Sequence, residues 1–179
     1  MIIGDGIRLR AAERTDIPKF VEWLNDVEVR QYLLIYFPMS MAFEEKWFEE
    51  NVNRPPAEQV LVIEIFTENG WKAIGNTSLM HISDVDRHAE IGIFIGEKSE
   101  WSKGHGRKAM KLMLNYGFNT LNLNRIFLQV YENNLRGIHA YKAAGFVEEG
   151  RMRQAKFQNG KYLDILLMSV LRDEWQAEN

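Results

Sequence analysis

Residues 101–106, with the sequence Trp-Ser-Lys-Gly-His-Gly, place two glycines one residue apart at the start of a basic, helix-like segment. The first amides of a helix have no internal partner, and the helix dipole is positive at that end, so phosphate binds there. Glycine removes the side chains that would keep an anion away from these amides. Lys103, Arg107 and Lys108 add positive charge at the same end. The spacing therefore indicates an anion-binding turn, and a plain helix start is the alternative.

This turn matches neither of two common phosphate-binding patterns. The chain lacks G-x-x-x-x-G-K-[ST] and also lacks G-x-G-x-x-G. An ordinary nucleotide triphosphatase or dinucleotide-binding domain is therefore not indicated.

A second group of residues that could do chemistry lies downstream. Asn134 precedes Tyr141 by seven positions, and Gly145-Phe146 follows. A phenol has a reference pKa near 10, so Tyr141 is a proton donor at neutral pH; a tyrosine packed in the core is the alternative. Asn134 is suited to contact a ligand, to cap the helix that starts at Leu135, or to do both.

Glu90 is the carboxylate best placed to act as a base, because it lies on the apolar segment before the glycine turn. A carboxylate beside a pocket accepts a proton directly or through water, whereas a glutamate that is solvated or paired with lysine or arginine would have no such role. His81 and His88 are weaker candidates. His88 and Glu90 share one side of a strand, but two ligands without further clustering do not make a metal site, so we expect no metal.

Hydrophobic periodicity predicts the elements that position these residues. Ser40 and Thr15 are expected to cap helices, Gly145 to end one, and Asn159-Gly160 to turn a hairpin. Residues 89–131 read as strand, helix and strand, which predicts one parallel strand pair with a helical crossover. Strands are expected at 7–12, 59–66, 71–82, 89–96, 125–131, 146–158 and 161–171, and helices after Thr15, at 26–33, 41–53, 107–121 and 135–144.

Composition limits the class of protein. The 179 residues suit a single domain, 1–179, with a real core. A net charge of −3 is unlike that of a general nucleic-acid binder, so we expect no direct nucleic-acid partner. The chain has no cysteine, and the N-terminus has no signal-peptide layout. No apolar run is long enough to span a membrane. We therefore expect a cytoplasmic protein without a membrane partner.

The glycine turn resembles the Q/R-x-x-G-x-G/A motif of the GNAT family of acetyl-CoA-dependent N-acetyltransferases, with Trp101 in place of glutamine or arginine. Residues 134–141 and Gly145-Phe146 resemble its N-x-x-[AS]-x-x-x-Y…G-F motif, with Gly137 in place of alanine or serine. The similarity extends over nearly the whole chain, towards the ribosomal-protein alanine and spermidine acetyltransferase branches. It implies a mixed α/β (α+β) fold with a mostly antiparallel central sheet flanked by helices, in which a splayed strand pair binds acetyl-CoA.

The resemblance also implies roles for individual residues. Tyr141 would act near the CoA sulfur, and Glu90 corresponds to a base found in some members, while many others use water and backbone carbonyls. Backbone amides of the turn would hold the CoA pyrophosphate, and the pantetheine arm would pair with the strand at about 94–96. The cosubstrate contacts implied are Phe94, Ile95, Gly96, Trp101, Ser102, Lys103, Gly104, His105, Gly106, Arg107, Asn134 and Tyr141.

The acceptor amine is less well specified by the sequence. We expect direct attack in a ternary complex by a protein N-terminal amine, with spermidine, spermine or another small amine as the alternative and a non-catalytic acyl-CoA sensor as a lesser one. The pocket should involve the N-terminal helices, the loop 83–88 and the final hairpin. Relatives are often dimers, which leaves a homodimer open. Acidic residues in these regions would attract a polyamine, but we expect them to be the solvated charges of ordinary helix faces and loops: Glu44, Glu45, Glu49, Glu50, Asp84 and Asp86.

Overall fold

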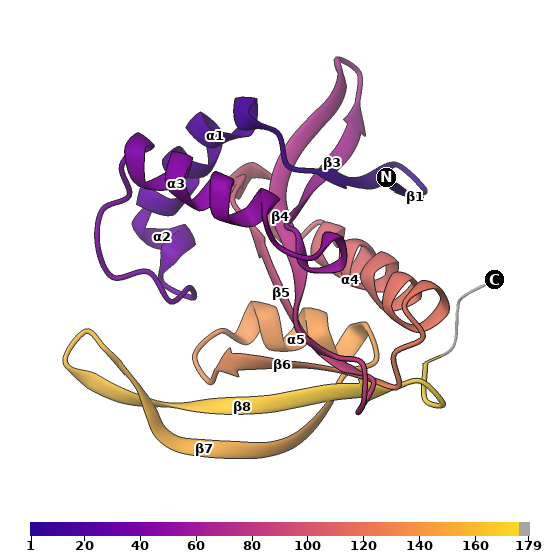
Figure 1. Ribbon diagram of the computed structural model, residues 1–179. Coiled ribbons are helices and arrows are strands. Elements are labelled where there is room, and N and C mark those ends of the chain that lie inside the picture. Colours follow the sequence, from indigo (N-terminus) through magenta and orange to yellow (C-terminus); the bar gives the residue numbers. More distant parts are fainter. Residues whose placement is uncertain (176–179) are drawn as a thin grey trace.

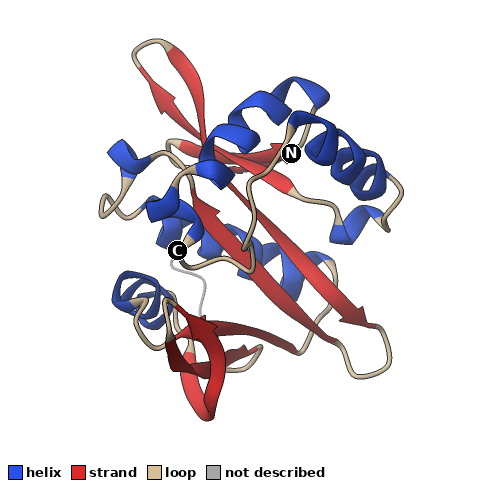
Figure 2. Ribbon diagram, turned by 90° about the vertical axis from the view of Figure 1, so that its left-hand side faces the viewer, coloured by secondary structure: helices blue, strands red, loops and turns tan. Residues whose placement is uncertain are grey.

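The computed structural model describes residues 1–175, which form one eight-stranded sheet with helices against both faces (Figures 1 and 2). The strands follow the order β1-β2-β3-β4-β5-β6-β8-β7, and only β5 and β6 pair in parallel. The strands are β1 (Ile2–Gly4), β2 (Ile7–Ala11), β3 (Leu61–Thr67), β4 (Gly70–Ser83), β5 (His88–Ile95), β6 (Arg125–Tyr131), β7 (Val147–Gln158) and β8 (Lys161–Leu171). The predicted fold class is confirmed.

Two groups of helices cover opposite faces of the sheet. Neighbouring residues of a strand point to opposite faces, and Val62 belongs to the apolar cluster under α1–α3, whereas Ile63 belongs to the cluster under α4 and α5. The helices are α1 (Ile17–Asn25), α2 (Val27–Arg30), α3 (Met41–Val52), α4 (His105–Asn115) and α5 (Leu135–Ala143).

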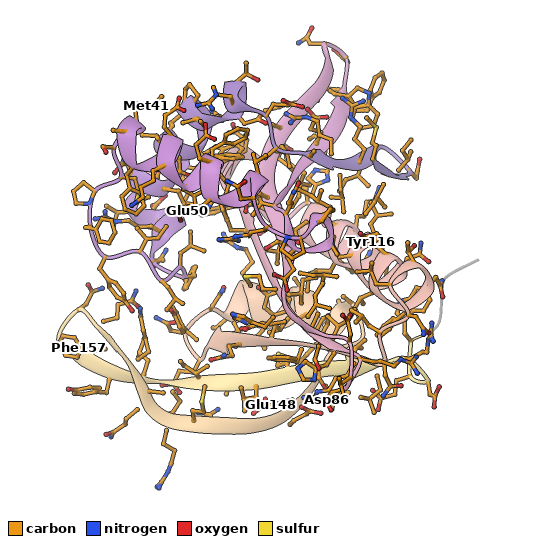
Figure 3. The ribbon with its side chains drawn as sticks, in the orientation of Figure 1. Met41, Glu50, Asp86, Tyr116, Glu148 and Phe157 are labelled. Atoms are coloured by element: carbon orange, nitrogen blue, oxygen red, sulfur yellow. The ribbon has the colours of Figure 1, made fainter. Side chains whose placement is uncertain are left out.

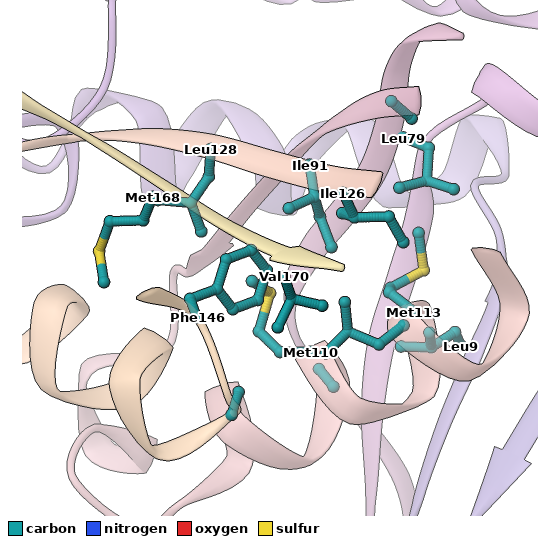
Figure 4. Close-up of a cluster of buried hydrophobic side chains, with 14 of the residues drawn as sticks. Leu9, Leu79, Ile91, Met110, Met113, Ile126, Leu128, Phe146, Met168 and Val170 are labelled. Carbon is teal, nitrogen blue, oxygen red and sulfur yellow. The ribbon is translucent and has the colours of Figure 1, made fainter. Parts of the chain in front are cut away.

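The larger apolar cluster fixes α4 against the sheet. Met110 and Met113 of α4 are fully buried and face Ile91 and Ile126, which come from the two parallel strands (Figure 4). Burial of such a side chain contributes about 1.5–3 kcal/mol. The buried face of α4 therefore holds this helix against the sheet, and with it the glycine turn at the start of the helix.

Most of the predicted elements are confirmed. β6 has the predicted bounds, and α4 is continued by a π-helical turn, Tyr116–Thr120, so the helical run ends one residue before the predicted limit. Asn159 and Gly160 both have positive φ, 50° and 77°, as a tight hairpin turn requires. Gly145, at φ 100°, ends α5 as predicted.

One local prediction is wrong and one element was missed. The short strand β1 is absent from the prediction. Thr15 does not cap α1; instead a 3₁₀ turn precedes the helix, and Asp16 accepts a hydrogen bond from the amide of Glu13 at 2.8 Å. The buried face of α3 is formed by Glu44, Phe48 and Asn51, and Phe43 is 47% exposed.

The parallel strands separate soon after they meet. β5 pairs with β6 only from His88 to Glu90, although β5 continues to Ile95 and β6 to Tyr131. The far halves of the two strands thus diverge, which confirms the predicted splayed pair. No helix within residues 1–175 is long and apolar enough to cross a bilayer.

Candidate active site

A cavity of about 950 Å³ opens where β5 and β6 diverge. Its walls come from β5 from Glu90 onwards, the glycine turn, the end of β6, the length of α5 and the segment after α2. Of the predicted site residues, the cavity is lined by Glu90, Phe94, Ile95, Trp101, Ser102, Gly104, His105, Gly106, Arg107, Asn134 and Tyr141. The fold therefore brings together residues that lie up to 51 positions apart, from Glu90 to Tyr141.

The glycine turn leaves the start of α4 open. Gly104 is the N-cap residue with φ 84°, a left-handed conformation that favours glycine, and no side chain caps the helix. A Cβ added at Gly104 would meet no atom within 4 Å, and one at Gly106 would meet only Ile95 Cγ1 at 4.0 Å. The first amides of α4 thus face space that an anion can enter.

Two predicted cosubstrate contacts do not line this cavity. The ammonium of Lys103 lies 3.1 Å from Glu100. The amide of Gly96 donates to the carbonyl of Ile74 at 2.8 Å, so it is not available to a ligand arm. A Cβ at Gly96 would come within 2.3 Å of the ring of Trp23, which gives this glycine a packing role.

Asn134 caps α5. Its side-chain oxygen accepts a hydrogen bond from the Gly137 amide at 3.0 Å, so one of its two predicted roles is confirmed and a cosubstrate contact stays a prediction. The same carboxamide explains Gly137, because a Cβ there would lie 2.6 Å from Asn134 Nδ2.

Tyr141 projects from α5 into the cavity wall and packs against Phe146, with ring centroids 6.2 Å apart. Burial raises the pKa of Tyr141 to about 12, and the positive charge of Arg136 opposes part of that rise. Within residues 1–175 no hydrogen-bond partner is found for its hydroxyl. Tyr141 is therefore a protonated phenol at neutral pH whose hydroxyl is available to a ligand.

Glu90 sits at the last point where β5 and β6 pair, and its carboxylate is held from two sides. Oε2 lies 3.1 Å from His81 Nδ1, and Gln129 Nε2 lies 3.4 Å from Oε1. His81 reaches Glu90 from a bulge in β4, where its φ is 53°; bulges commonly redirect side chains next to active sites. Glu90 is not paired with lysine or arginine within the described residues. His88 instead faces Phe127.

The acceptor side of the cavity differs from the prediction. Tyr32, Leu33 and Leu34, which follow α2, line it together with Tyr131 and Ile165, but no residue of the loop 83–88 does. None of the six acidic residues singled out from the sequence lines it either. Glu50 on α3 and Asp86 beyond β4 lie far apart on the surface (Figure 3). Most of these carboxylates are thus ordinary surface charges.

Glu44 is the exception among those acids. It is 3% exposed, and its Oε2 has no hydrogen-bond partner among the described residues. Burial raises its pKa to about 7. Glu44 shares a helix face with the buried Phe48, four positions later, so its burial follows the helical period although its acidic side chain suggests solvent exposure. No group of three or more potential metal ligands is found within residues 1–175.

Comparison with known proteins agrees with this geometry. Residues 7–147 match the acetyltransferase (GNAT) domain. The chain belongs to the GNAT acetyltransferase family. It is a GNAT enzyme that uses acetyl-CoA, as the resemblance implied.

Several GNAT relatives are similar over nearly the full chain. The spermidine N(1)-acetyltransferase of Vibrio cholerae is 34% identical over 173 residues, covering 94% of this chain and 95% of the relative. A putative ribosomal N-acetyltransferase of Bacillus subtilis is also 34% identical, but over 58% of this chain and 56% of the relative. The crystal structure of the V. cholerae spermidine N-acetyltransferase with CoA and spermine superposes with a TM-score of 0.86 at 30% identity, covering 96% of this chain and 98% of that one.

Proposed function

We propose that this GNAT enzyme acetylates a polyamine such as spermidine, rather than the protein N-terminal amine that was the first expectation from the sequence. One observation carries the proposal: the relatives named as spermidine acetyltransferases match 94–97% of this chain, whereas the ribosomal one matches 58%. The site is compatible with it, since Glu90 offers a carboxylate to an ammonium group at the junction of β5 and β6.

The proposed transfer uses one proton acceptor and one proton donor. The nitrogen of a neutral amine attacks the thioester carbon, so that the C–N bond forms, the C–S bond breaks and the electron pair leaves on sulfur. Glu90, directly or through water, takes the proton that the nitrogen loses. Tyr141 donates a hydrogen bond and then a proton to the sulfur, which leaves as the thiol, and regains its proton from solvent.

The diverging strands support this arrangement of the two substrates. Unpaired backbone at the end of β5 is suited to a pantetheine arm that adds as a short strand, and Phe94 and Ile95 line the cavity there. The open start of α4 is suited to the pyrophosphate. Tyr141, which lines the same cavity as Tyr32 and Tyr131, would then lie beside the thioester.

An amine screen tests the proposal. Thiol release from acetyl-CoA is followed with spermidine, spermine and putrescine, and with peptides that begin with a free alanine. We expect kcat/KM for spermidine to exceed that for the peptides by at least about tenfold. Preference for the peptides would overturn the polyamine proposal. CoA binding without turnover of any amine would overturn acetyl transfer itself and indicate the sensor alternative.

A further inference from the structure

The cations of the glycine turn are fewer than the sequence indicates. Lys103 is engaged by Glu100 at 3.1 Å, and Glu100 also lies 3.5 Å from His105. Lys108 points away and donates to the carbonyl of Asp5 at 3.3 Å. Of the three basic side chains counted there, Arg107 alone lines the cavity. A pyrophosphate bound at this turn would therefore have the helix amides and only Arg107 of these three cations beside it.

Arg136 supplies a cation from another element. It lies in the first turn of α5, lines the same cavity, and has no carboxylate partner within residues 1–175. A cation in the first turn of a helix opposes the helix dipole, and this costs about 0.3–1 kcal/mol. The helix dipole therefore disfavours this position in the free protein, and a bound anion would remove that cost.

Trp101 fixes the place of this guanidinium. Arg136 Cζ lies 3.6 Å from the centroid of the Trp101 ring. The indole Nε1 donates to the carbonyl of Ile95 at 2.7 Å, and the ring packs against the cluster of Phe20 and Trp23. The ring therefore holds Arg136 next to the glycine turn, a stacking mode that suits arginine better than lysine.

We propose that Arg136 is a phosphate-binding residue for CoA, that Trp101 positions it, and that it acts together with Arg107, which lines the same cavity. Some family members carry an arginine where this chain has Trp101, and in this chain Arg136 of α5 would supply that positive charge instead. A guanidinium binds phosphate through two parallel hydrogen bonds, which gives direction as well as charge. The inference rests on the proposed binding of CoA at this turn and does not depend on which amine is acetylated.

The test separates the phosphates from the rest of the cosubstrate. Calorimetry gives the Kd of CoA and of 3′-dephospho-CoA without any acceptor, and kcat/KM is measured with acetyl-CoA and with S-acetylpantetheine, which has no phosphate. We expect Arg136→Ala to raise the Kd of CoA by about tenfold to a hundredfold. With S-acetylpantetheine, its kcat/KM should stay within about twofold of wild type. Arg136→Lys should recover only part of the affinity.

Two further variants complete the experiment. Trp101→Leu, which removes the stacking surface, should weaken CoA without changing S-acetylpantetheine turnover. Lys142→Ala, on the exposed last turn of the same helix, is the matched control and should leave both values unchanged. The proposal is overturned if Arg136→Ala leaves CoA affinity unchanged, or if it weakens CoA and S-acetylpantetheine equally. Failure of the wild-type protein to bind CoA at all would instead refute the proposed function.

Discussion

Glu44 allows a prediction whose magnitude follows from the structure. Its carboxyl group is 3% exposed, has an oxygen without a partner among the described residues, and has a pKa raised from 4.5 to about 7 by burial. The folded protein then binds more protons than the unfolded chain between these two values. The free energy of unfolding should therefore be unaffected by Glu44 ionisation below pH 4.5, and it should fall as the pH rises towards 7 and slightly beyond.

Glu44→Gln keeps the size of the side chain and removes the titration. Each pKa unit corresponds to about 1.36 kcal/mol, so the full cost of ionising Glu44 is about 3.4 kcal/mol, of which about 1.4 has accrued at pH 5.5. The stability of the variant relative to wild type should thus rise by about 2 kcal/mol between pH 5.5 and pH 8. Any effect of the glutamine amide on stability that is the same at both pH values cancels in this difference.

Urea unfolding at the two pH values measures this change, with equal m-values as the check for two-state behaviour. Glu50→Gln, on the exposed face of the same helix, is the control for the substitution itself. A gap between Glu44→Gln and wild type that stays constant with pH would refute the reasoning, because Glu44 would then ionise as easily in the folded protein as in the unfolded chain.

Three other predictions concern the site. Gly104→Ala should lower the free energy of unfolding by about 1–2 kcal/mol, because the φ of Gly104 is 84°. Gly106→Ala should weaken CoA binding with little loss of stability. Equal losses of stability in the two variants would contradict this. Glu90→Gln should lower turnover by about a hundredfold and change the shape of the pH–rate profile; an unchanged profile removes its role as base. Lys156 is 4% exposed and donates a hydrogen bond to the Tyr36 hydroxyl at 2.6 Å. Lys156→Met should therefore release the loop beyond α2 and raise KM for the amine several-fold, with KM for acetyl-CoA unchanged. A parallel rise in both KM values would refute this.

Local signals in the sequence explain why much of the fold was predictable. Asn159-Gly160 specifies its turn through positive φ, and the spacing of Met110 and Met113 marks the buried face of α4. The positions of Gly104 and Tyr141 at the cavity follow from the two family motifs. In each case a short stretch of chain carries the information.

The features that were missed depend on contacts between distant segments. Glu44 is buried although an acidic side chain suggests solvent exposure, and the amide of Gly96 donates to the carbonyl of Ile74, twenty-two positions away. The place of Arg136 at the cavity depends on its contact with the ring of Trp101, which belongs to another segment of the chain. Of the predicted acceptor wall, α2 and the final hairpin line the cavity through Val29 and Ile165, but the loop 83–88 does not, since no local signal shows which loop faces the cavity.

Tyr141→Phe tests the central claim most directly, because it removes only the hydroxyl proposed to protonate the leaving sulfur. With spermidine and acetyl-CoA, turnover should fall by about 10²–10⁴-fold, while the Kd of CoA measured by calorimetry should stay within about twofold. Since burial raises the pKa of Tyr141 to about 12, the wild-type rate should also show no loss from this group below about pH 11. Equal falls in turnover and CoA affinity, or no change in either, would contradict the account.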